Sequence, residues 1–132
     1  MRCLVTGATG FIGSHLVRFL LQKGNEVSVL IRSNSNHWRI RDMLSAVRII
    51  YGDMTAMSQI YDDIQSFKPD IVFHLAWHGG TSYKHQNDSA QIFRNLYGSL
   101  ELVQLAKEAG SQRWVGFGTS VEYDKYDIPI TE

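Results

Sequence analysis

The chain has 132 residues, 44% of them hydrophobic and 20% charged, which is typical of one globular domain and leaves no room for a second. Its 13 basic and 13 acidic residues cancel, so the balance predicts neither a nucleic-acid partner nor a membrane-surface partner. No segment approaches the ~18 consecutive apolar residues of a membrane span. The single cysteine, Cys3, excludes an internal disulfide and is expected to be a buried, inert thiol in a cytoplasmic protein.

The first part of the chain reads as strand, helix and strand. A short apolar run at 3–5 predicts a buried strand, and apolar residues at helical spacing from Ile12 to Leu20 predict a helix that Gly24 closes. Residues 27–31 predict the second strand. After a polar loop, residues 37–41 combine basic and aromatic side chains, and we interpret them as the solvated face of a helix rather than a phosphate-binding tract.

The alternation continues to the end of the chain. Strands are predicted at 48–51, 71–73 and 114–117, with a helix at 57–67 that ends before Pro69 and a long helix at 92–109. The apolar face of the long helix is marked by Phe93, Leu96, Leu100 and Val103. Strands that alternate with helices imply right-handed crossovers and a parallel sheet, so we expect a three-layer, doubly wound α/β domain of about five strands.

Ligands of such sheets bind beyond the carboxyl ends of the strands, where the winding direction reverses. This rule brings together the loops that begin at Gly7, Ala76 and Gly118. Thr6 to Gly13 contains glycines at positions 7, 10 and 13, placed where the first strand turns into the first helix. They permit a tight turn, a close approach of backbone to a pyrophosphate, and close helix packing, and the helix N-terminus offers N–H groups to phosphate. The loop therefore predicts dinucleotide binding, with a merely connecting glycine-rich turn as the alternative.

The Gly-x-x-Gly-x-x-Gly spacing resembles that of the short-chain dehydrogenase/reductase superfamily. Later motifs resemble its extended branch of NAD(P)-dependent epimerases, dehydratases and reductases, many of which act on nucleotide sugars. Residues 52–54 resemble the acidic segment near the adenine, 74–77 the His-Leu-Ala-Ala segment, and 95–98 the Asn-x-x-Gly element. Residues 118–123 resemble the stretch with the catalytic hydroxyl, which falls on Thr119. The resemblance spans essentially the whole chain and implies a Rossmann fold over residues 1–132.

The resemblance implies catalytic roles for Thr119 and Asn95. Together with the loops, it predicts that the cofactor is bound by Gly7, Thr9, Gly10, Phe11, Ile12, Gly13, Arg32, Ser33, Asp53, Met54, Leu75, Ala76 and Trp77. No metal site is predicted, because His74, His78 and His85 straddle a loop and lack a nearby pair of carboxylates.

Several of these residues also fit simpler roles. Asp53 fits a turn cap, and His74 is better explained as a hydrogen-bonded histidine at a strand end than as a catalytic base. Trp77 and Trp114 fit packing, and an isolated asparagine in a helix, such as Asn95, commonly faces solvent.

In the resembled family the catalytic pair is a tyrosine with a lysine four residues later, which lowers the pKa of the phenol. The residues four positions after the six tyrosines are Thr55, Gln65, Asn87, Glu101, Asp127 and Ile130. None is lysine. Residues 128–132 resemble the lead-in to the helix that carries the pair, so we expect the chain to stop short of it and of the substrate domain, and to be inactive by itself.

The end of the second strand bears on the choice of cofactor. NAD-preferring Rossmann domains carry an acidic residue there for the ribose 2′-OH, whereas this chain has Ile31 followed by Arg32, with no adjoining carboxylate. NADP is therefore predicted over NAD, unless Arg32 stacks on the adenine or lies in solvent.

Three functions fit these motifs. They are an epimerase, dehydratase or reductase of a nucleotide sugar, a non-catalytic NADP sensor, and an NADPH-dependent ketone reductase of the same superfamily. Thr119 and Asn95 favour an enzyme, since a sensor needs neither. The resemblance also implies a homodimer through the long helix at 92–109.

Overall fold

Five parallel strands form one sheet in the order β3-β2-β1-β4-β5. The structure is a computed structural model and describes residues 1–79 and 88–118. The strands are β1 (Arg2–Thr6), β2 (Glu26–Ile31), β3 (Arg48–Tyr51), β4 (Ile71–His74) and β5 (Arg113–Gly116). They confirm the five predicted strands.

The helices are α1 (Phe11–Gln22), the 3₁₀ turn η1 (Met57–Gln59), α2 (Tyr61–Phe67), the π-helical η3 (Ile92–Tyr97) and α3 (Gly98–Glu108). The predicted helix at 57–67 is thus two short pieces that meet at Ile60, which is fully buried. At its end Lys68 takes a left-handed conformation with φ of 51°, in keeping with the rule that a residue before proline avoids the helical region. The long helix consists of η3 running directly into α3.

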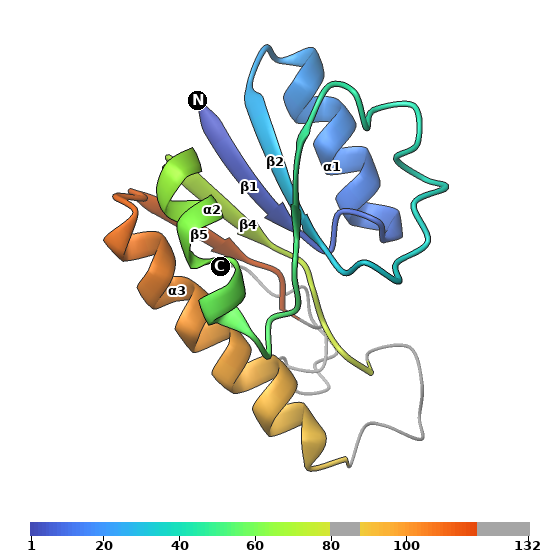
Figure 1. Ribbon diagram of the computed structural model, residues 1–132. Helices are drawn as coiled ribbons and strands as arrows, with labels where there is room; N and C mark the ends of the chain where they lie inside the picture. Colours follow the sequence, from blue (N-terminus) through green and yellow to red (C-terminus); the bar gives the residue numbers. More distant parts are fainter. Residues whose placement is uncertain (80–87, 119–132) are drawn as a thin grey trace, which may run out of the picture.

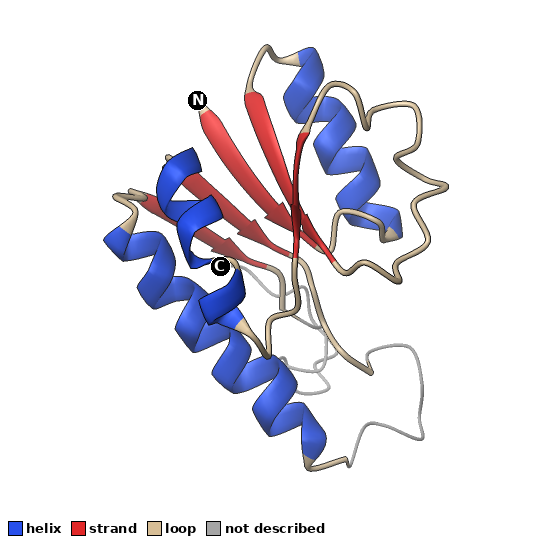
Figure 2. Ribbon diagram, in the orientation of Figure 1, coloured by secondary structure: helices blue, strands red, loops and turns tan. Residues whose placement is uncertain are grey.

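Side chains of each central strand point alternately to the two faces of the sheet. Cys3 and Val5 of β1 pack with α1 in one core cluster, whereas Leu4 packs with α2 and α3 in the other. Figure 1 shows α1 on one side of the sheet and α2 and α3 on the other, and Figure 2 shows the same three layers by element type. The domain is therefore the predicted doubly wound α/β fold.

The winding direction reverses at β1. The chain moves from β1 to β2 and β3 on one side and then places β4 on the other side of β1, with Thr6 opposite His74 in register. The loops that leave β1 and β4 therefore emerge side by side, which is where ligands bind in sheets of this kind.

The predicted helix around residues 37–41 is wrong. The N–H groups of Ile40, Met43 and Ala46 each donate to the carbonyl three residues earlier, so the connection from β2 to β3 is a series of turns. Asn36 also uses its side chain to accept the Trp38 N–H, a local bond that competes with helix formation. The turns bury Ile40 and Met43 in the core cluster on the α1 side.

The apolar side chains that mark the long helix lie on its exposed face. Phe93, Leu96, Leu100 and Val103 are 71, 55, 57 and 41% exposed. The helix instead packs against the sheet and α2 through Leu102, Leu105 and Ala106. None of the helices in the described ranges has the length and apolar character needed to cross a bilayer.

Candidate functional site

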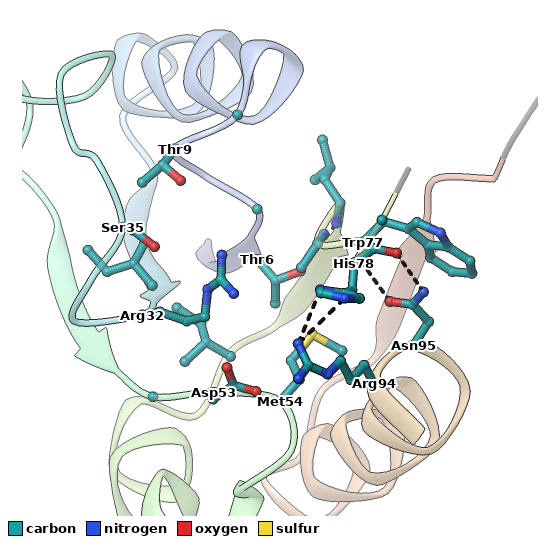
Figure 3. A pocket seen from close by; sticks show the side chains of 18 residues that line it. Thr6, Thr9, Arg32, Ser35, Asp53, Met54, Trp77, His78, Arg94 and Asn95 are labelled. Carbon is teal, nitrogen blue, oxygen red and sulfur yellow. Dashed lines mark hydrogen bonds between the residues drawn. The ribbon is translucent and has the colours of Figure 1, made fainter. Parts of the chain in front are cut away.

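A cavity of about 370 Å³ opens beyond the carboxyl ends of β1 to β4. Its walls come from five segments: the glycine loop after β1, the end of β2, the loop after β3, the loop after β4 and the beginning of η3. Figure 3 shows that these segments, far apart in the chain, direct their side chains toward one space. Two of the three predicted ligand loops, those that begin at Gly7 and Ala76, thus lie side by side. The third begins at Gly118, the last of the described residues, and its remainder lies outside them.

Most of the predicted site residues line this cavity. Those that do are Gly7, Thr9, Gly10, Arg32, Asp53, Met54, Leu75, Ala76, Trp77 and Asn95. Phe11, Ile12 and Gly13 instead form the first turn of α1, where Phe11 and Ile12 are exposed. Thr119 lies outside the described residues.

Ser35, rather than the predicted Ser33, lines the cavity. The N–H of Ser35 donates to the carbonyl of Arg32 over 3.0 Å, and this turn folds Ser35 back toward the site while Ser33 stays exposed.

The glycine loop is in direct contact with the loop after β4. Gly7 has φ of +70°, and a Cβ built on it would lie 2.7 Å from both the Ala76 nitrogen and the Leu75 carbonyl carbon. A Cβ on Gly13 would lie 2.2 Å from the Gly7 carbonyl oxygen, so Gly13 lets the helix pack against the loop itself. The two loops therefore form a continuous floor of backbone that any side chain at position 7 would push apart.

The N-terminus of α1 faces the same loop. Gly10 is its N-cap, no side chain caps it, and its first turn holds no acidic residue. The N–H groups of the first turn have no partner within the helix and carry partial positive charge. This end of α1 can therefore hold an anionic group such as a pyrophosphate.

His74 closes the inner end of the site. It is 7% exposed, with Nδ1 at 2.8 Å from Thr6 Oγ1 and Nε2 at 3.0 Å from Ser99 Oγ. Burial lowers the pKa of His74 from 6.5 to about 4, so the ring is neutral at pH 7. It is the hydrogen-bonded strand-end histidine that was expected. Trp114, expected to pack, lies against it with ring centroids 5.1 Å apart.

Asn95, predicted as a site residue, is 4% exposed, so the simpler alternative that it faces solvent is wrong. Its Oδ1 accepts the His78 N–H over 2.8 Å, and its Nδ2 donates to the His78 carbonyl over 3.0 Å (Figure 3). The side chain thus pairs with backbone as a neighbouring strand would, and it holds the loop after β4 against η3.

Three charged side chains meet in the cavity. Burial raises the pKa of Asp53, but hydrogen bonds from the N–H and hydroxyl of Thr55 and the charges of Arg32 and Arg94 outweigh it, and the net pKa lies below the ordinary value. Asp53 is thus both a turn cap and a cavity residue. The argument that no carboxylate stands near Arg32 is wrong, because Asp53, in the loop after β3, lines the same cavity and its pKa is lowered by the charge of Arg32 (Figure 3).

The sequence reasoning missed Arg94 and His78 as cavity residues, and its alternative role for Trp77, packing, is wrong. Arg94 Nη1 lies 3.4 Å from Nδ1 and 3.5 Å from Nε2 of His78. Its position directly before Asn95 was a signal that could have identified it. Trp77 is 59% exposed rather than packed. Within the described ranges, no group of three or more His, Cys, Asp or Glu side chains is arranged to hold a metal ion.

The strand order, the glycine loop and the cavity at the winding reversal together define a dinucleotide-binding domain of the Rossmann type. The model of the NAD dependent epimerase/dehydratase family matches residues 3–132, and the chain belongs to this family.

Curated relatives and solved structures are similar to most of this chain. A dTDP-6-deoxy-L-talose 4-dehydrogenase (NAD(+)) of Aggregatibacter actinomycetemcomitans is 32% identical over 124 residues, covering 89% of this chain and 44% of the relative. The enzyme WbmG of Bordetella bronchiseptica, solved in complex with NAD, is 30% identical with a TM-score of 0.77, covering 92% of this chain and 38% of that one. A UDP-glucose-4-epimerase from Stenotrophomonas maltophila, solved with NAD and formylated UDP-arabinopyranose, is 25% identical with a TM-score of 0.84, covering 97% and 40%. The chain spans less than half the length of each.

Proposed function

We propose that residues 1–132 are a single domain that binds the nicotinamide dinucleotide of an epimerase, dehydratase or reductase acting on a nucleotide sugar. The observation that carries the proposal is the cavity, in which the uncapped N-terminus of α1 faces the same space as Arg32, Asp53 and the loop after β4. The relatives support the substrate class, since their names specify dTDP- and UDP-linked sugars.

The residues fit such a cofactor in three parts. Gly7, Thr9, Gly10 and the first turn of α1 would hold the pyrophosphate, because the glycine loop lines the cavity and the N–H groups of the first turn have no partner within the helix. Arg32, Asp53 and Met54 would hold the adenosine part. Leu75, Ala76 and Trp77 would contact the part that leads to the nicotinamide. The bound cofactor supplies the hydride chemistry, and the chain's own residues bind and orient it.

The finer proposal is a preference for NADP. It is supported by Ile31, which is 4% exposed and offers no acceptor to a ribose 2′-OH, and by Arg32, which is directed into the cavity (Figure 3). Asp53 and the NAD found in the solved relatives speak for NAD instead. Arg32 can donate charge-assisted hydrogen bonds to a 2′-phosphate, and these decide the preference if they outweigh repulsion by Asp53.

Calorimetric titration of NADP and NAD into the wild type, Arg32→Ala and Ile31→Asp tests both levels. Arg32→Ala is expected to weaken NADP by about ten- to hundredfold, the effect of about 1.5–3 kcal/mol for a hydrogen bond to a charged group, and to leave NAD little changed. Ile31→Asp is expected to shift preference toward NAD. Arg41→Ala, an exposed arginine outside the cavity, is the matched control. Equal or tighter binding of NAD by the wild type contradicts the preference, and binding of neither contradicts the proposed function.

A second candidate is a non-catalytic dinucleotide sensor, because Asn95 does not distinguish it from an enzyme. Its amide is engaged by the His78 backbone, a structural role that a sensor needs as much as an enzyme. The case for an enzyme then depends on Thr119, which lies outside the described residues, and on the relatives, whose names are those of enzymes. A ketone reductase shares the same cofactor residues, so it differs only in substrate.

The exposed apolar face of η3 and α3 supports a homodimer. Among the described residues this face gathers Ile92, Phe93, Leu96, Tyr97, Leu100 and Val103. Phe93 and Tyr97 stack with centroids 5.2 Å apart, which makes it continuous. A second copy of the chain presenting the same face would bury the apolar faces of both copies.

A cytoplasmic location belongs to the same proposal, supported by the free thiol of Cys3, which is buried.

A further inference from the structure

A chain of hydrogen bonds runs from Thr6 at the cavity wall on β1, through His74 on β4, to Ser99 on α3. Thr6 Oγ1 lies 2.8 Å from His74 Nδ1, and His74 Nε2 lies 3.0 Å from Ser99 Oγ. Thr6 and His74 are buried, at 0 and 7% exposed. None of the three is needed for the cofactor contacts already described, so their arrangement requires another explanation.

The direction of every proton in this chain follows from the bond at its Ser99 end and from the neutral form of the ring. Ser99 donates its hydroxyl hydrogen to the Asn95 carbonyl over 2.5 Å, because a carbonyl can only accept. Ser99 Oγ must then accept a hydrogen from His74 Nε2. The ring is neutral, so Nδ1 carries a lone pair and accepts the hydroxyl hydrogen of Thr6.

The same arrangement completes the bonding of Thr6. Its oxygen accepts the N–H of Leu75 over 3.2 Å and the N–H of Ala76 over 3.1 Å, while its hydrogen goes to His74. In the opposite tautomer, with the hydrogen on Nδ1, three donors would point at Thr6 Oγ1 and its hydrogen would have no acceptor in this chain. At the other end two lone pairs would face each other. Buried groups left unsatisfied in this way are costly.

The network holds the loop after β4 at both of its ends. Thr6 binds its first N–H groups at Leu75 and Ala76, where a Cβ on Gly7 would already collide with the backbone. Asn95 binds its far end at His78. His74 and Ser99 connect these two attachment points, since His74 binds Thr6 and Ser99 donates to the Asn95 carbonyl.

We propose that His74 is a positioning residue, locked as the neutral Nε2–H tautomer by Thr6 and Ser99, which sets the loop 75–78 against the glycine loop and so shapes the cofactor cavity. The part that concerns the cofactor rests on the proposed function. The groups that contact the ring are uncharged: Thr6 on β1, Ser99 on α3 and Trp114 on β5. Only hydrogen-bond direction and burial therefore select the form of the ring.

Long-range ¹H–¹⁵N NMR of ¹⁵N-histidine-labelled protein tests the tautomer without any cofactor. The His74 signal is assigned as the one that disappears in His74→Gln or, if that variant does not fold, as the one that changes in Ser99→Ala. This signal is expected to show the Nε2–H pattern. It is also expected to stay unchanged from about pH 8 down to about pH 5.5, since burial keeps the ring neutral there. An Nδ1–H pattern, or a titration near the ordinary pKa of histidine, overturns the assignment.

Cofactor affinity tests the positioning role. Ser99→Ala is expected to weaken the preferred dinucleotide about two- to tenfold, the effect of one neutral hydrogen bond, and Ser99→Thr to restore affinity by keeping the hydroxyl. Ser58→Ala, an exposed serine outside the cavity, is the control. If the wild type binds the dinucleotide and Ser99→Ala binds it with the same affinity, the positioning role is overturned. Absence of binding by the wild type contradicts the proposed function instead, and the tautomer pattern then decides the network alone.

Discussion

Acidification from pH 7 to about pH 5 is expected to lower the free energy of unfolding by about 2 kcal/mol through His74. The pKa of His74 is 6.5 when unfolded and about 4 when folded, a shift of about 2.5 units. At about 1.36 kcal/mol per unit, the full effect is about 3.4 kcal/mol. Because the folded-state pKa is the lower one, the unfolded chain takes up the proton first. The contribution is present above pH ~6.5, falls through the window down to pH ~4 and is then constant.

Urea unfolding of the wild type, His74→Gln and His15→Gln at several pH values between about 7 and 5, followed by circular dichroism, measures this effect. His74→Gln is expected to be less stable at neutral pH but to lose about 2 kcal/mol less than the wild type on acidification. His15, which is exposed on α1, is the matched histidine control. Carboxylates with lowered pKa, such as Asp53 and Asp70, act mainly below this range and are common to all three proteins. Equal pH dependence of the wild type and His74→Gln would refute the reasoning.

Three further changes test other parts of the structure. Gly7→Ala is expected to lower the free energy of unfolding in urea by about 2–4 kcal/mol, because the residue has positive φ and its Cβ would strike the loop after β4. Gly24→Ala, with positive φ but nothing within 4 Å of the added Cβ, should lower it by only about 1 kcal/mol. Equal losses would show that the contact is unimportant. Leu100→Glu should convert a sedimenting dimer to a monomer, whereas Phe19→Glu, at an apolar residue of similar exposure on α1, should leave the dimer intact. A monomeric wild type at high concentration would contradict the interface. Purified residues 1–132 should catalyse no hydride transfer from NADPH or NADH, because no tyrosine has a lysine four residues later, and steady turnover free of contaminants would disprove this.

The strands and the glycine loop could be predicted because their signals are local. A strand buried on both faces needs a short apolar run, as in residues 3–5 and 27–31, whatever surrounds it. Glycine at position 7 reports a backbone conformation that other residues adopt at a cost, and the structure confirms it with φ of +70°. Alternation of strand and helix then determined the doubly wound sheet, since parallel neighbours require right-handed crossovers.

The turns at 37–46 and the exposed face of the long helix depended on tertiary packing. Ile40 and Met43 are spaced three apart, which suits a helix, but each fits a gap beside α1 that successive turns reach. The stripe from Phe93 to Val103 is apolar at helical spacing, yet the sheet side of the helix is occupied by Leu102, Leu105 and Ala106. Periodicity shows that a helix has an apolar face, and cannot show what that face contacts.

Within the site, the sequence by itself determined which segments carry polar groups, while only the tertiary structure decided which groups meet. Asp53 acts on Arg32 because β3 lies beside β2, although 21 positions separate the two residues in the sequence. Asn95 binds the backbone of His78 because η3, on which it is the buried residue, lies beside the loop after β4. Hydrogen bonds and charge interactions act over a few ångströms in space, so their partners are set by strand order and helix packing rather than by neighbours along the chain.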